Sequence, residues 1–177
     1  MALVALSLGS NIEPARNLLL AVAMLRGAGR IVGVSRVFET DPVGAPGQPP
    51  FLNAAVLFET TLDPAALKRD VIRGIERALG RVRDPADRNA ARTIDIDISL
   101  WEGEAGPGGP PPPDPDVTRR AHVAAPLADL LPERIVPGDG RALGEIAAAL
   151  VAPGAAPEAA PRARGDLSLR GAAGLGA

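Results

Sequence analysis

Residues 92–101, Arg-Thr-Ile-Asp-Ile-Asp-Ile-Ser-Leu-Trp, alternate polar and apolar side chains over most of their length. A period of two is typical of a strand with one buried face and one open face. The apolar positions expected in a core are Ile94, Ile96, Ile98 and Leu100. The polar positions that share the other face are Thr93, Asp95, Asp97 and Ser99. The segment therefore predicts a sheet strand that displays two carboxylates on one face.

Asp95 and Asp97 are unusual in such a place, because strands disfavour Asp. A rise of about 3.3 Å per residue puts their β-carbons roughly 7 Å apart. At an effective dielectric constant of about 20, two carboxylates at that distance repel each other by roughly 2 kcal/mol. A hard divalent cation such as Mg²⁺, bridged to phosphates, would relieve the repulsion. The alternative is an acidic face that meets only solvent or a few arginines.

Arginines cluster just before this strand, at Arg81, Arg83, Arg88 and Arg92. Guanidinium groups bind phosphate oxygens through paired hydrogen bonds. Acids for a metal ion and arginines for phosphates are together what phosphoryl transfer requires. The segment from Arg81 to Trp101 is therefore the candidate site.

The composition indicates one globular domain with an aliphatic core. The chain has 177 residues, of which 46% are hydrophobic and only 2% aromatic. A net charge of −2 argues against a general nucleic-acid-binding protein. The lack of Cys excludes disulfides and thiolate chemistry, and the single His122 excludes multi-histidine metal sites. No apolar run is long enough for a membrane span, so we expect a cytoplasmic protein with no membrane contact.

The order of predicted elements indicates an α+β domain over residues 1–151. Apolar runs predict strands at 2–8, 31–39 and 51–59. A helix starting at Pro14 follows the first of them, and a helix starting at Pro64 lies between the third and the Asp95 strand. Gly9-Ser10-Asn11 lacks the spacing of a phosphate-binding loop and is interpreted as a tight turn. We expect a mainly antiparallel sheet with helices on one face. Residues 152–177 are rich in Ala, Gly and Pro and are predicted to be a disordered tail.

Six motifs in this order resemble the 6-hydroxymethyl-7,8-dihydropterin pyrophosphokinases of folate biosynthesis. They are Leu8-Gly9-Ser10-Asn11, Thr40-x-Pro42-x-Gly44, Phe51-Leu52-Asn53-Ala54-Ala55-Val56, Gly80-Arg81-Val82-Arg83, Arg92-Thr93-Ile94-Asp95-Ile96-Asp97 and Arg120-Ala121-x-Val123-x-Ala125-Pro126-Leu127. The resemblance runs from about Ala5 to Leu150. It implies a ferredoxin-like fold and a transferase that moves pyrophosphate from ATP onto the pterin hydroxymethyl group, releasing AMP.

The resemblance also implies roles for individual residues. Asp95 and Asp97 would hold two Mg²⁺ ions along the ATP triphosphate, and Arg81 and Arg92 would neutralise the transferred group. The positions implied at the nucleotide are Glu76, Arg83, Arg88, Ile98, Asp114 and Arg120. The positions implied at the pterin are Thr40, Pro42, Val43, Phe51, Asn53 and His122. Small molecules, ATP and a pterin, would be the ligands of a monomeric enzyme.

Three departures from the family pattern leave other hypotheses open. Asn89-Ala90-Ala91 stands where relatives usually carry Trp-Gly-Pro, Asp114 replaces a His that contacts ATP, and His122 replaces a Phe that stacks on the pterin. A relative that keeps the fold and the pterin site but turns over poorly is the main alternative. A small RNA-binding ferredoxin-like module is a more distant one, disfavoured by the acidic charge balance and the lack of paired exposed aromatic residues on strands.

Overall fold

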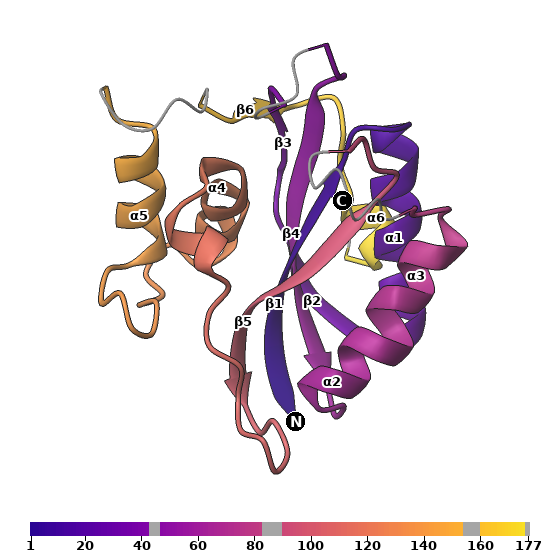
Figure 1. The fold of residues 1–177 in the computed structure, drawn as a ribbon, viewed down its shortest axis with the longest axis vertical. Coiled ribbons are helices and arrows are strands. Elements are labelled where there is room, and N and C mark those ends of the chain that lie inside the picture. The colour runs from indigo at the N-terminus through magenta and orange to yellow at the C-terminus, as the bar shows by residue number, and fades with distance from the viewer. Residues whose placement is uncertain (43–46, 83–89, 154–159, 176–177) are drawn as a thin grey trace.

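The computed structural model describes residues 1–42, 47–82, 90–153 and 160–175. A sheet with helices on both faces makes up this part of the chain (Figure 1). The strands are β1 (Ala2–Ser10), β2 (Arg30–Val34), β3 (Val37–Thr40), β4 (Phe51–Thr60), β5 (Asp95–Gly103) and β6 (Arg162–Arg164). The helices are α1 (Pro14–Ala28), α2 (Pro64–Ala66), the π-helix η1 (Leu67–Ile72), α3 (Arg73–Ala78), the 3-10 helix η2 (Pro115–Thr118), α4 (Ala121–Leu130), α5 (Leu143–Leu150) and α6 (Arg170–Ala173).

Every strand pair in the described residues is antiparallel, which confirms the predicted sheet type. The strands follow the order β5-β1-β4-β3-β6, and β2 also pairs with β4. The acidic strand β5 is therefore an edge strand beside β1. The opposite edge of the sheet is formed by β6, far along the chain.

Helices cover both faces of the sheet, although we expected them on one face only. Figure 1 shows α1, α3 and α6 on one side of the strands and α4 and α5 on the other. The physical reason is visible in β4, where residues 54–58 are apolar without interruption and buried. Neighbouring strand residues point to opposite faces, so both faces of β4 must be covered. Two hydrophobic cores result, the first around Phe58 beneath α1 and the second around Leu127 of α4.

The strand β5 contains a bulge at Ser99. Leu100 pairs with Ala5 of β1 and Ile98 pairs with Leu6, so Ser99 is an extra residue between them. Ile96 and Ile98 of the strand, with Ile94 just before it, face the first core as predicted. Leu100 lies in the second core, and Trp101 returns to the first. The prediction that Leu100 shares the isoleucine face is therefore wrong. Asp95 and Asp97 precede the bulge and keep the face that the alternation gave them.

The segment predicted as one strand at residues 31–39 forms two, β2 and β3, separated at Ser35. The Ser35 N–H donates to the Ala55 carbonyl (2.9 Å), while the Ser35 hydroxyl oxygen accepts from the Ala55 N–H (2.8 Å). Because one side chain completes the pairing with β4, the chain bends there without an unpaired buried donor. The predicted helix start is confirmed at Pro64, where the Asp63 carboxylate accepts from the Ala66 N–H (2.8 Å).

The C-terminal segment was predicted to be disordered, and this is wrong for its described part, residues 160–175. β6 pairs with β3, and α6 packs against α1 (Figure 1). Leu169 and Ala173 are buried in the first core. The prediction rested on the average composition of the segment. That average does not show a few buried apolar residues, nor the backbone hydrogen bonds that an unpaired sheet edge can form. None of the helices in the described ranges is long and apolar enough to cross a membrane.

Candidate functional site

The candidate site lies on the face of the sheet that α4 covers, around a row of three paired residues. Asn53 of β4 is opposite Gly9 of β1, and Gly9 is opposite Asp95 of β5. Residues paired in this way point to the same face of the sheet. The Asn53 amide and the Asp95 carboxylate therefore share a face, on strands about 10 Å apart. A β-carbon at Gly9 would stand 3.2 Å from Asn53 Oδ1. A side chain at Gly9 would therefore crowd the Asn53 amide.

Asp95 lies against two of the predicted arginines. Its Oδ2 accepts a hydrogen bond from Arg92 Nη1 (2.6 Å) and lies 3.3 Å from Arg81 Nη2. The Arg81 side chain is only 9% exposed, so this contact is largely withdrawn from water. The structure thus brings together three of the four residues implied in catalysis. The guanidinium groups balance the charge of Asp95 in the ligand-free chain.

Asp97 lies in a different electrostatic setting on the same strand face. Burial raises its pKa to about 6, and the negative charges of Asp95 and Asp114 add to the rise. Lys68 opposes the shift without cancelling it. Negative charge is therefore in excess around Asp97, which is the condition under which a cation binds favourably.

The donor set suits a hard cation that also binds phosphate. Asp95 and Asp97 offer carboxylate oxygens, which Mg²⁺ prefers. Among the described residues no cluster of three or more potential ligands is assembled for a metal. An ion at this site would take its remaining ligands from phosphate oxygens and water, as Mg²⁺ commonly does in nucleotide sites.

Glu76 is buried at 3% exposure, although its position in the helix also suggested an ordinary solvated side chain. Its Oε1 accepts from the backbone N–H of Ile96 (3.3 Å). Ile96 belongs to the edge strand β5, so Glu76 satisfies a donor on the open side of that strand. The carboxylate also contributes to the raised pKa of Asp97.

Asn11 connects several parts of the site and was missed by the sequence analysis. Its Oδ1 accepts from the Arg92 N–H (2.7 Å), and its Nδ2 donates to Gln48 Oε1 (3.0 Å). The backbone N–H groups of Asn11 and Ile12 both donate to the Arg92 carbonyl (3.1 and 3.2 Å). The turn after β1 therefore fixes the backbone of Arg92. Interpreting Gly9-Ser10-Asn11 only as a tight turn overlooked that a buried Asn side chain needs partners.

The residues implied at the pterin lie next to Asn11 and Arg92. Asn53 Nδ2 donates to Thr40 Oγ1 (2.9 Å), and both side chains are buried. Phe51 pairs with Thr40 across β3 and β4, and the Arg92 guanidinium lies 5.5 Å from the centre of the Phe51 ring. An amide has two donors and one acceptor, so the bond to Thr40 orients Asn53 without exhausting it. Pro42 follows β3 closely, and Val43 lies outside the described residues.

The remaining nucleotide and pterin positions surround the same face. The Asp114 N–H donates to the Ser99 carbonyl (3.0 Å), which joins the start of η2 to β5. The Asp114 carboxylate accepts from the Asp116 N–H (2.8 Å) and so caps η2. Arg120 and the half-buried His122 stand at the start of α4, with Arg120 Nε 3.9 Å from Asp116 Oδ1.

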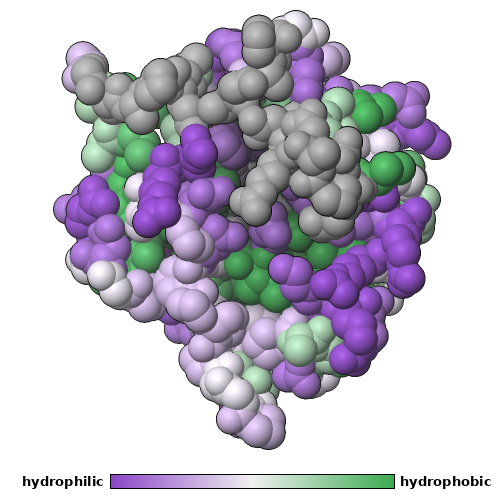
Figure 2. All heavy atoms as spheres, viewed as in Figure 1, coloured by the Kyte–Doolittle hydropathy of each residue, from purple (hydrophilic) through white to green (hydrophobic). Residues whose placement is uncertain are grey.

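Three further positions complete the account of the sequence predictions. Ile98 of β5 packs against the first core, on the opposite side of the sheet from the acids. Arg83 and Arg88 lie outside the described residues. In the orientation of Figure 1, Figure 2 shows hydrophilic side chains over the outside of α3 and apolar atoms in the middle of the view, beside β5.

Comparisons with known proteins show which family the chain belongs to. A family model described as 7,8-dihydro-6-hydroxymethylpterin-pyrophosphokinase (HPPK) matches residues 5–132. The protein of Pseudomonas aeruginosa named 2-amino-4-hydroxy-6-hydroxymethyldihydropteridine pyrophosphokinase is 42% identical over 122 residues, which cover 68% of this chain and 72% of that protein. The protein of the same name from Methylorubrum extorquens is 39% identical over 138 residues, which cover 76% of this chain and 85% of that protein.

Solved structures with a similar fold include the Plasmodium falciparum HPPK-DHPS protein with pteroate, at a TM-score of 0.63 and 15% identity. The match covers 85% of this chain and 42% of that longer chain, and at this identity it shows the fold alone. The family match and the bacterial relatives go further. This chain belongs to the 7,8-dihydro-6-hydroxymethylpterin-pyrophosphokinase family.

Proposed function

We propose that this protein transfers pyrophosphate from ATP to 6-hydroxymethyl-7,8-dihydropterin and releases AMP, a step of folate biosynthesis. Membership of the family supports the reaction. The observation in the chain itself that carries the proposal is the row Asn53–Gly9–Asp95. It places an amide suited to a heterocycle and a carboxylate suited to a metal on one face of the sheet.

The reaction requires little from the protein beyond position and charge. The oxygen of the pterin hydroxymethyl group bonds to the β-phosphorus of ATP, and the bond from that phosphorus to the oxygen bridging to the α-phosphate breaks. The hydroxyl proton is lost and AMP leaves with the bridging oxygen. No covalent intermediate on the protein is needed, so orientation and neutralisation of charge supply the catalysis.

Asp95 and Asp97 are the residues that would hold Mg²⁺, with two ions expected. Magnesium bound there would supply positive charge to the phosphate oxygens and fix the triphosphate. The raised pKa of Asp97 supports this assignment, because it comes from burial and from the negative charges of neighbouring acids, both of which a bound cation would offset. Glu76 and Asp114 lie near enough to influence Asp97 and are expected to face the nucleotide side.

Arg81 and Arg92 have two alternative partners in this proposal. In the ligand-free chain they lie against Asp95 at 3.3 and 2.6 Å. When Asp95 ligates a cation, the same guanidinium groups can turn their donors to phosphate oxygens. Arg92 keeps its backbone bonds to Asn11 in either case, so only its side chain has to move. Arg83, Arg88 and Arg120 are expected to add contacts to ATP.

On the pterin side, Asn53 is expected to bind the donor and acceptor edge of the ring. Thr40 orients the Asn53 amide through its hydroxyl group. Phe51, the neighbouring Pro42 and Val43, and His122 at the start of α4 are expected to pack around the ring. An imidazole can stack on a heterocycle, although it offers less area than the Phe of relatives. A monomeric state and a cytoplasmic location complete the proposal.

The test is release of AMP from ATP, with Mg²⁺ and 6-hydroxymethyl-7,8-dihydropterin present. The matched control is 6-methyl-7,8-dihydropterin, which fills the same space but has no hydroxyl group to attack. AMP formation that needs both the hydroxymethyl compound and Mg²⁺ is the expected result. Pterin binding in calorimetry without pterin-dependent AMP would contradict the proposal and identify a fold-retaining binding protein.

A further inference from the structure

The C-terminal segment 160–175 lies along the strand that carries Thr40. The pairs between β3 and β6 are Val37 with Arg164, Phe38 with Ala163, and Glu39 with Arg162. On its other side β3 pairs with β4, where Phe38 is opposite Asn53. The strand β3 is thus held between the substrate-side strand β4 and the C-terminal segment. The family match ends at residue 132, so the segment lies beyond the part shared with the family model.

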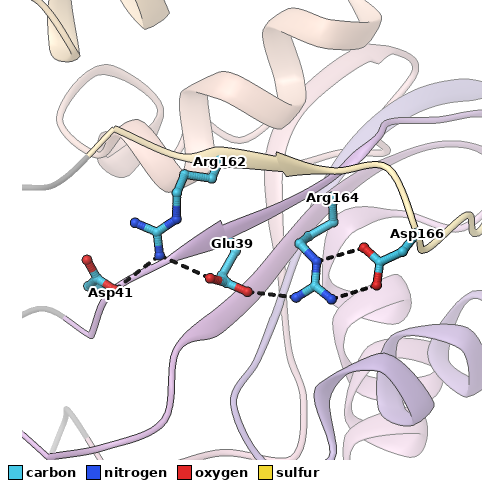
Figure 3. A network of polar contacts seen from close by, with 5 residues as sticks. All are labelled: Glu39, Asp41, Arg162, Arg164 and Asp166. Atoms are coloured by element: carbon cyan, nitrogen blue, oxygen red, sulfur yellow. Dashed lines mark hydrogen bonds and ion pairs between the residues drawn. The ribbon is translucent and has the colours of Figure 1, made fainter.

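A chain of ion pairs joins the two strands, as Figure 3 shows. Glu39 accepts from Arg162 Nη2 (3.0 Å) and from Arg164 Nη1 (2.7 Å). The same Nη2 of Arg162 donates to Asp41 Oδ1 (3.3 Å). Arg164 in turn makes two hydrogen bonds to Asp166, at 2.8 and 2.6 Å. Arg162 is therefore the member of the network that bonds to both Glu39 and Asp41.

Glu39 and Asp41 are the two neighbours of Thr40 in the sequence. The side chain of Thr40 points to the sheet face of the candidate site and bonds to Asn53, while its neighbours carry the carboxylates that Arg162 holds. A shift of β3 away from β4 would lengthen the Thr40–Asn53 bond. The bonds from Arg162 oppose a displacement on either side of Thr40.

The segment also has an anchor of its own, independent of the ion pairs. Leu169 and Ala173 are buried at 1% and 4% exposure in the first core, and Leu167 packs against it. The helix α6 contacts α1, on the far side of the sheet from α4 (Figure 1). Because this end is held by apolar packing, β6 has a fixed point from which Arg162 can restrain β3.

We infer that Arg162 is a positioning residue for pterin binding, because it fixes both neighbours of Thr40 and thereby keeps Thr40 in its bond with Asn53. The inference rests on the proposed function for the identity of the ligand. Arg162 makes its bonds at the opposite edge of the sheet from the acids of β5, so its effect should be confined to the pterin. It assigns a substrate-directed role to a segment outside the family match.

The test is the Arg162→Ala variant, assayed for AMP release with each substrate varied in turn. We expect KM for the pterin to rise about threefold to fivefold, the range that an exposed ion pair allows. The values of kcat and of KM for ATP should stay unchanged, which a general loss of structure would not produce. Arg162→Lys should restore part of the affinity.

Two matched variants separate the contacts. Arg164→Ala removes one bond to Glu39 but keeps the link between Arg162 and Asp41, so its effect on KM for the pterin should be smaller, about twofold or less. Arg141→Ala removes an exposed pair with Asp139 elsewhere on the surface and should change neither KM. An unchanged pterin KM in Arg162→Ala, or an equal rise in both KM values, would overturn the inference.

A binding measurement distinguishes failure of the inference from failure of the proposed function. The same variants are titrated with the pterin in a calorimeter, with Mg²⁺ and a non-hydrolysable ATP analogue present. A wild-type protein that releases no AMP but binds the pterin more tightly than Arg162→Ala would refute the function and support the role of Arg162. A wild-type protein that binds no pterin would overturn both.

Discussion

The two edges of the sheet both carry arginines and carboxylates, but the surroundings shift the carboxyl pKa values in opposite directions at the two edges. At the β6 edge, the guanidinium groups of Arg162 and Arg164 lower the pKa of Glu39. At the β5 edge, burial and neighbouring acids raise the pKa of Asp97 to about 6. At the β6 edge every carboxylate of the network accepts a hydrogen bond from a guanidinium group, whereas at the β5 edge Asp97 is buried beside other acids. The difference indicates which edge is structural and which is prepared for a cation and phosphates.

The two edges should also respond to pH in opposite directions. A lowered carboxyl pKa contributes stability above the unfolded pKa, and this contribution is lost as the pH falls through the folded pKa. Glu39 therefore stabilises the protein at neutral pH and ceases to do so in acid. A raised pKa has the reverse effect, so Asp97 destabilises the metal-free protein increasingly as the pH rises from about 4 to about 6.

The largest expected effect is on turnover at the β5 edge. Asp95→Asn or Asp97→Asn should reduce AMP release at least about a hundredfold, because each removes a metal ligand worth several kcal/mol in the transition state. Steady-state kinetics over a range of Mg²⁺ concentrations checks this. Asp139→Asn, which alters an exposed carboxylate paired with Arg141, is the control and should keep wild-type rates. Wild-type AMP release in either site variant would contradict the metal assignment.

Removal of the β6 edge should affect stability. A chain that ends at residue 159 loses the strand β6 and the buried Leu169, and we expect its free energy of unfolding to fall by about 3 kcal/mol or more. Urea titration of the truncated and full chains measures the difference. Leu169→Ala is a milder variant that tests the anchor alone. If the truncated chain has the stability of the full chain, the docking of the segment contributes nothing.

Substitution of Asp95 or Asp97 by Asn should change the free energy of unfolding of the metal-free protein in opposite directions. Asp97→Asn removes the unfavourable buried charge, so the free energy of unfolding at neutral pH should rise by about 1–3 kcal/mol, and its fall between about pH 4 and 6 should flatten. Asp95→Asn breaks the contacts with Arg81 and Arg92, so stability should decrease. Urea titrations across this pH range compare them. The same sign of change in both variants would refute the proposed difference between the acids.

The last prediction concerns Asp114, where the family resemblance implies a His. Asp114 adds to the negative charge at Asp97, so ATP should bind more weakly than it would with a neutral side chain. Asp114→Asn keeps a helix-capping side chain and removes the repulsion, and Asp114→His also adds a donor. Calorimetry with Mg²⁺ and a non-hydrolysable ATP analogue should show tighter binding in both, with the His variant gaining up to about 1.5–3 kcal/mol. Unchanged affinity in both would place Asp114 away from the nucleotide.

The sequence predicted the shared face of Asp95 and Asp97 better than it predicted the bulge in their strand or the docking of the C-terminal segment. Asp95 and Asp97 share a face because a period of two is set by backbone geometry and needs no tertiary information. The bulge at Ser99 left no such signal, since Leu100 and Trp101 are both apolar and fit either core. The role of Asn11 was equally hidden, because its partners Arg92 and Gln48 are brought to it only by folding.

The prediction for the C-terminal segment was wrong for a different reason. Its average composition is that of a disordered chain, and the prediction weighed the whole stretch at once. A few leucines, together with one short strand on an open edge, are enough to dock part of it. Such docking depends on what the rest of the chain leaves uncovered, which composition does not report.

The bulge at Ser99 has a consequence for the way the protein opens. Because Ile96 and Trp101 lie in one core and Leu100 lies in the other, β5 cannot leave the sheet without disrupting both. Local opening of α4 or of α1 alone would leave β5 paired with β1. The amide hydrogens of β5 that bond to β1 should therefore exchange with solvent only through unfolding of the whole domain. Asp95 and Asp97 would then belong to the last part of the protein to lose its structure.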